Sequence, residues 1–156
     1  MSLEHAPTSL TLEQLWQFSL QYYSVRGVKD ACLALQNQHH GNVNLLLLLK
    51  WLDEQQLSFA EQEWHKVQQC LTRSENLLHN YRELRKHLKT HVSDSLYREA
   101  LQFELQLEKQ QQADLVDCIN SLALVTNQHS PLALQYCRLL GAENLYHAFS
   151  EPAPQP

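Results

Sequence analysis

Glycine and proline are scarce in this sequence, and their scarcity argues against sheet-rich and loop-rich folds. Only three glycines occur among the 156 residues, and three of the five prolines (Pro152, Pro154 and Pro156) lie in the last five positions. Leucine, glutamine, glutamate and alanine, which all favour helices, are abundant. Because glycine and proline interrupt helices most often, this composition predicts an all-α protein.

The sequence also lacks a net positive charge and recognisable catalytic motifs. The formal net charge is -5, which disfavours a dedicated nucleic-acid binder, because such proteins carry a basic surface. The sequence has no phosphate-binding glycine loop, no nucleophile elbow and no HExxH pair. Its longest apolar run is far shorter than a bilayer needs, and its beginning lacks the pattern of a signal peptide. We therefore expect a cytoplasmic protein without a membrane span, a cofactor or catalytic residues.

The cysteines and histidines do not form a convincing metal site. The four cysteines are scattered among apolar neighbours without a CxxC pair, which predicts small buried side chains in a reducing compartment. Glu83, His87 and His91 share one face of a predicted helix at metal-ligand spacing. They lack a fourth ligand, and Arg85 and Lys86 beside them repel a cation. We interpret this face as solvated and predict no bound metal.

One stretch, Asn42–Asp53 (NVNLLLLLKWLD), organises the predicted fold. Its five consecutive leucines, Leu45–Leu49, leave no polar face on a helix, so this helix should be buried on all sides. We predict a single all-α domain over residues 11–149, a bundle of six or seven helices packed around this leucine helix. Residues 1–10 are expected to form a flexible arm, and residues 150–156 a disordered proline-rich tail.

A long antiparallel helical hairpin is the second predicted feature. Residues 59–91 contain neither glycine nor proline, and Ser93 is suited to cap a following helix. Apolar residues recur at helical spacing in both halves: Leu77, Tyr81, Leu84 and Leu88 in the first, and Leu96, Ala100, Phe103 and Leu107 in the second. This heptad-like spacing predicts that the two helices pack along these residues.

Basic residues gather where this hairpin is expected to turn. Five of the twelve basic residues fall within residues 82–98, namely Arg82, Arg85, Lys86, Lys89 and Arg98. Only two acidic residues lie in the same range. Such separation of charge in an acidic protein can steer a partner of opposite charge. Our first hypothesis is a non-catalytic interaction or adaptor module that binds a protein partner through this basic tip. A homodimer in which the apolar seams of two hairpins pair is a further alternative.

A polar-aromatic cleft supplies the rival hypothesis. Asn44 lies in the first turn of the leucine helix, and a buried amide without partners costs about 1–3 kcal/mol. In a purely structural role, Asn44 would bond the adjacent turn or the end of the preceding helix near Gln36. Alternatively, Trp16, Tyr23, Gln36 and Asn44 line a cleft, and the protein is a small-ligand-binding or enzymatic domain. Both interpretations stay open at this point.

The first 52 residues resemble a known family. The matching residues form an ordered string: Trp16, Phe18, Ser19, Leu20 and Tyr23, then Gly27 and Val28, then residues 31–36, Gly41 and residues 43–47, and finally Trp51 and Leu52. This string is similar to that of the domain-of-unknown-function 2390 family of uncharacterised proteobacterial proteins. The resemblance implies a cytosolic bacterial protein and supplies no activity.

Overall fold

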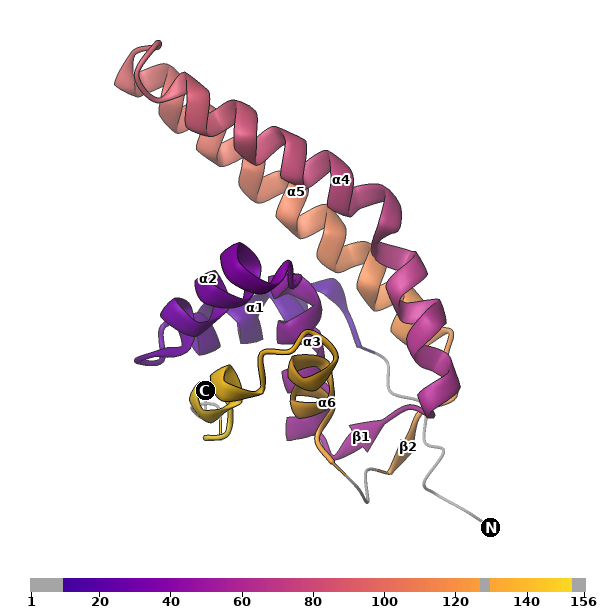
Figure 1. Ribbon diagram of the computed structural model, residues 1–156. Coiled ribbons are helices and arrows are strands. Elements are labelled where there is room, and N and C mark those ends of the chain that lie inside the picture. Colours follow the sequence, from indigo (N-terminus) through magenta and orange to yellow (C-terminus); the bar gives the residue numbers. More distant parts are fainter. Residues whose placement is uncertain (1–9, 127–129, 153–156) are drawn as a thin grey trace.

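The computed structural model describes residues 10–126 and 130–152, and almost all of its regular structure is helical (Figure 1). The body consists of α1 (Leu12–Tyr23), α2 (Val28–His39), α3 (Val43–Glu54), α6 (Leu132–Leu139) and the 3₁₀ helix η2 (Glu143–Phe149). A short 3₁₀ turn, η1 (Glu61–Glu63), leads into the hairpin of α4 (Trp64–Leu88) and α5 (Asp94–Asn120). Strands β1 (Leu57–Ser58) and β2 (Val125–Thr126) pair at the base of this hairpin. The predicted all-α fold is confirmed.

The leucine helix α3 forms the centre of the core, as predicted. Leu45–Leu49 are at most 4% exposed, and helices α1, α2, α5 and α6 all contact α3. The side chain of Asn42 caps the helix by accepting the Leu45 N–H at 2.9 Å. Gly41 precedes this cap in a tight space, where an added Cβ would lie 2.6 Å from Leu35 Cγ. Glycine therefore permits the close approach between the α2–α3 turn and the core.

The N-terminal helix is anchored at both ends. Thr11 and Gln14 form the reciprocal capping box that opens α1, and Gly27 turns the chain into α2 with a φ of 86°. Leu10 is buried, and its carbonyl accepts a hydrogen bond from Asn120 Nδ2 at 2.8 Å. The rest of the predicted flexible N-terminal segment (residues 1–9) and the last four residues of the predicted tail lie outside the described residues.

The hairpin has a base that belongs to the core and an arm that leaves it. Trp64, Val67, Leu71 and Leu78 of α4 are buried, and α5 packs against α1 and α3 near its C-terminal end. None of residues 79–110, all of which the structure describes, is buried. Figure 1 shows this distal part of α4 and α5 projecting past the body. We call residues 79–110 the arm.

The contact between the two helices of the arm differs from the predicted apolar seam. Leu96 is 50% exposed and Leu84 is 53% exposed, so the prediction was wrong for these two side chains. Phe103 is also 50% exposed, but its ring lies 5.5 Å from that of Tyr81 on the other helix. The register is set at the base, where Leu71 and Leu78 are buried at a seven-residue spacing. Continuing that spacing brings Arg85 to the contact, where its guanidinium meets Glu104 of α5.

Candidate binding groove between the hairpin and the first helices

A groove of about 640 Å³ separates the hairpin from α1 and α2. Its lining comes from five helices, namely α1, α2, α3, α4 and α5. It includes all four residues of the predicted polar-aromatic cleft: Trp16, Tyr23, Gln36 and Asn44. It also includes three of the five residues of the predicted basic tip: Arg82, Arg85 and Lys86. The two sets of candidate residues therefore meet in one place.

The walls of the groove are apolar and open to water. Leu20 of α1 and Leu33 of α2 line the body side, at 54% and 38% exposure. Leu101 and Leu105 of α5 line the hairpin side, at 37% and 48% exposure. Exposed leucines contributed from two sides of one concavity are typical of a surface that binds another apolar group.

The floor of the groove is a buried network of amides. Asn44 Nδ2 donates to Glu108 Oε2 at 2.8 Å and to Gln111 Oε1 at 2.9 Å, both on α5. Gln112 Nε2 donates to Asn44 Oδ1 at 3.1 Å and to Ser19 Oγ at 3.0 Å. Asn44 thus connects α3 to α5 rather than to the adjacent turn or to the end of α2.

Gln111 and Gln112 are the groove-side residues that the sequence did not point to. Both are 1% exposed, although they lie in the polar segment EKQQQAD of α5, which reads as solvated. The only signal for them is indirect, because a buried Asn44 must find partners on some neighbouring helix. Gln112 Oε1 is buried in the described structure without a hydrogen-bond donor. The floor therefore holds one acceptor without a donor, and that acceptor is shielded from water.

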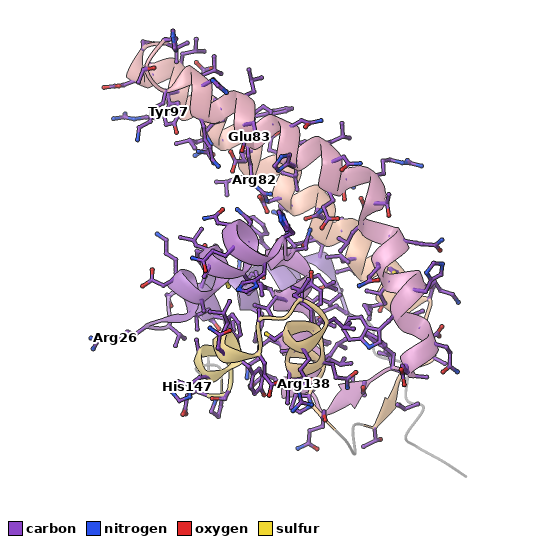
Figure 2. The ribbon with its side chains drawn as sticks, viewed as in Figure 1. Arg26, Arg82, Glu83, Tyr97, Arg138 and His147 are labelled. Atoms are coloured by element: carbon purple, nitrogen blue, oxygen red, sulfur yellow. The ribbon has the colours of Figure 1, made fainter. Side chains whose placement is uncertain are left out.

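Ion pairs form the upper rim of the groove. Arg82 donates to Glu108 Oε1, and Arg85 donates to Glu104 Oε1 at 2.7 Å. The hydrogen bond to Glu104 raises the pKa of Arg85 above its ordinary value, so this guanidinium stays charged. Figure 2 labels Arg82 on the hairpin at the level where the arm passes over α2. Two of the five predicted tip residues are therefore neutralised within the hairpin.

The remaining basic residues lie further along the arm. Lys86 Nζ is 3.3 Å from Glu83 Oε2, an exposed pair that contributes little to stability. Lys89 and Arg98 are exposed near the turn of the hairpin and do not line the groove. The structure therefore divides the predicted basic tip into a groove-lining group and a distal group.

The aromatic residues of the groove are held in different ways. The Lys109 ammonium lies 5.4 Å from the centroid of the Trp16 ring, a cation–π contact along one side of α1. Burial raises the pKa of Tyr23 above its ordinary value, so its hydroxyl remains protonated at neutral pH. Tyr23 can therefore donate as well as accept a hydrogen bond in the groove.

The described residues contain neither a metal-binding cluster nor a helix that could cross a membrane. Within residues 10–126 and 130–152, no three His, Cys, Asp or Glu side chains gather closely enough to hold a metal ion. In the same part of the chain, no helix combines the length and apolar character that crossing a membrane requires.

Comparisons with known proteins identify a family. Neither the curated proteins nor the solved structures contain a match. A family model described as "Protein of unknown function (DUF2390)" matches residues 14–115. These residues run from α1 into α5 and include the whole lining of the groove, and the match extends the resemblance seen in the first 52 residues. Because the match spans more than half of the chain, the protein belongs to the DUF2390 family of proteins of unknown function.

Proposed function

We propose that this protein is a non-catalytic interaction module that binds an amphipathic helix of a protein partner in the groove. The observation that carries the proposal is the pair of facing apolar walls, Leu20 and Leu33 on the body and Leu101 and Leu105 on the hairpin. A helix laid into such a groove buries its apolar face against both walls at once. The open groove also leaves the polar face of the bound helix in water.

The charges on the rim favour binding in the groove over binding at the tip. Arg82 and Arg85 are held by Glu104 and Glu108, so they present fixed, partly neutralised donors beside the apolar walls. Lys86 adds an exposed cation at the same rim. A partner helix whose flank carries acidic and polar residues would complement this edge. We therefore move the proposed contact from the turn of the hairpin to its groove side.

The proposal places the protein in the cytoplasm. The four cysteines, all within the described residues, carry free thiols, and three of them are buried. Burial raises the pKa of Cys32 to about 12, so that thiol is protonated and unreactive at neutral pH. Inert free thiols suit a reducing compartment.

A site-specific photo-crosslinker tests the proposal. The crosslinking residue is placed at Leu105 inside the groove and, as a matched control, at Leu139, which is 60% exposed on α6. We expect irradiation in the native cells to give a protein adduct at position 105 and none at position 139. A synthetic peptide copied from the crosslinked partner segment should then bind the purified protein and gain helical circular dichroism. Leu20→Glu and Leu105→Glu should weaken that binding at least about tenfold.

Two results would contradict the proposal. One is the absence of a protein adduct at position 105, and the other is a peptide whose affinity is unchanged by both groove variants. Leu139→Glu serves as the charge-matched control, because it adds the same carboxylate to an exposed leucine outside the groove.

A small organic ligand is the second candidate for the same groove. The volume of about 640 Å³ lies within the usual range of ligand sites. The unused acceptor Gln112 Oε1 would suit an N–H or O–H group of such a ligand. Native mass spectrometry of gently purified protein tests it. An adduct of small-molecule mass that is lost on denaturation and absent from Gln112→Leu would support this candidate, and bare protein would exclude it.

A further inference from the structure

An apolar stripe begins at Leu77, just before the arm, and continues along the arm, and nothing in the described structure covers it. Leu77 and Leu84 lie seven residues apart on α4, and Leu96 and Phe103 lie seven apart on α5. These four side chains are 50–62% exposed. The rings of Tyr81 and Phe103 lie 5.5 Å apart, which joins the two rows into one surface. We call Leu77, Tyr81, Leu84, Leu96 and Phe103 the back stripe.

The back stripe faces away from the groove. A helix turns about 100° per residue, so Leu101 and Leu105 each point about 160° away from Phe103 around α5. Leu101 and Leu105 line the groove, and Phe103 therefore belongs to the opposite side of the arm. Any partner on the back stripe contacts a surface separate from the proposed helix-binding groove.

The arm lacks a core of its own. Its interhelical contacts include the ion pairs of Arg82 and Arg85 with Glu104 and Glu108, a hydrogen bond from the Tyr81 hydroxyl to the Ala100 carbonyl, and the contact of the Tyr81 and Phe103 rings. Helices in proteins draw most of their stability from packing an apolar face, and here that face is the back stripe. Covering the stripe would supply the packing that the separate arm lacks.

We infer that a second copy of this chain covers the back stripe, so that two hairpins pack into a four-helix bundle. The seven-residue spacing occurs on both helices, which is the pattern that lets one hairpin interlock with another of the same kind. A two-fold axis through the stripe places each copy on the same surface of the other. The exposed Asn80 and Gln106 beside the stripe are uncharged, so two copies meet without repulsion at these positions. The exposed Glu99, between Leu96 and Phe103 on α5, is a charged neighbour that must stay in water at the edge of the contact.

The exposed area of the stripe supplies the central part of the interface that a reversible dimer needs. Each large side chain of the stripe leaves on the order of 100 Å² in water. Two copies would therefore bury roughly 800 Å² through the four most exposed side chains, before their neighbours are included. Specific interfaces bury about 1,200–2,000 Å² in total, so the stripe would supply about half of an ordinary interface as its apolar centre, and the flanking side chains must supply the rest.

The molar mass in solution tests this inference. Light scattering after size-exclusion chromatography, from about 1 to about 200 µM, should show wild-type protein reaching twice the chain mass. The double variant Leu84→Glu/Phe103→Glu should remain monomeric over this range. Leu139→Glu, the exposed control on α6, and Leu105→Glu in the groove should dimerise like wild type.

A pair of oppositely charged variants shows whether loss of the dimer comes from the interface or from unfolding of the arm. Leu84→Lys/Phe103→Lys should also be monomeric alone, and an equimolar mixture of the Glu and Lys variants should recover the dimer mass. A wild-type protein that is monomeric throughout the range would overturn the inference. So would a Glu variant that still dimerises, or a mixture that stays monomeric. The Leu105→Glu control separates this failure from a failure of the groove proposal.

Discussion

At the scale of single residues, Asn44 explains how the base of the hairpin is fixed to the core. Its amide is the one polar group in the first turns of an otherwise apolar helix, and it both donates to and accepts from α5. Gln111 extends the network by donating to Ser74 Oγ at 2.9 Å, which reaches α4. With the bond from Gln112 to Ser19 of α1, four helices share one set of hydrogen bonds.

Replacing Asn44 by leucine should lower the free energy of unfolding by about 2–4 kcal/mol. The substitution removes one hydrogen bond from each of Gln111, Gln112 and Glu108, although each keeps another partner. The loss of one buried hydrogen-bond partner costs about 1–3 kcal/mol. Urea denaturation measures the change, with Asn37→Leu as the control, because Asn37 is exposed at the same groove. A loss equal to that of the control would show that the network adds nothing to stability.

The sequence predicted the groove residues contributed by the body better than those contributed by the hairpin. Trp16 and Tyr23 lie on one face of a helix with a clear capping box, so their shared direction follows from local spacing alone. Gln112 is buried only because α5 crosses α3 at that level, and no local pattern encodes that crossing. The ionic contact of Arg85 with Glu104 could not be predicted from local spacing either, because the register of the hairpin is set at its base.

At the scale of elements, the start of α6 depends on a side chain from another helix. Asp53, at the end of α3, accepts the N–H groups of Leu132 and Ala133 at 2.7 and 3.0 Å. Burial raises the pKa of Asp53 to about 6, against the opposing effect of these two donors and of Lys50. Helix α6 begins directly after Ser130 and Pro131, but no side chain at its own N-cap accepts its first N–H groups. Asp53 from α3 accepts them.

This carboxyl predicts a pH-dependent stability of definite sign. Because the folded pKa is above the unfolded value of 3.8, the protonated carboxyl favours the folded state, fully so below pH 4. That contribution is lost as the pH rises through about 6. Between pH 4 and pH 7, the free energy of unfolding of wild type should fall relative to that of Asp53→Asn by at most about 3 kcal/mol. Thermal melting of both proteins across this pH range measures the difference. Parallel pH profiles of the two proteins would contradict the assignment.

At the scale of the whole molecule, the protein divides into a body with a dense core and an arm without one. The leucines of α3 are almost completely buried, while residues 79–110 depend on ion pairs and on whatever covers the back stripe. If two copies pair through the stripe, the stability of the arm must depend on protein concentration, and that of the body must depend on it much less.

Amide hydrogen exchange should therefore change with concentration in one region only. We expect protection of residues 79–110 to rise between about 1 and about 200 µM, whereas amides of α3 stay equally slow throughout. In Leu84→Glu/Phe103→Glu the arm should exchange quickly at every concentration. Equal concentration dependence in α3 and the arm would indicate a global association instead.

The two-residue pairing of β1 with β2 has a consequence for the groove. These strands join the chain just before α4 to the chain just after α5. Together with the hydrogen bonds of α5 to Asn44 and Ser19, they hold the base of the hairpin and leave its far end without such attachments. The 25 residues of α4 extend roughly 37 Å from that attachment. A tilt of only about 5° at the base would move the far end by roughly 3 Å. Because the groove lies between this hairpin and α1 and α2, such a tilt would change the distance between its two walls.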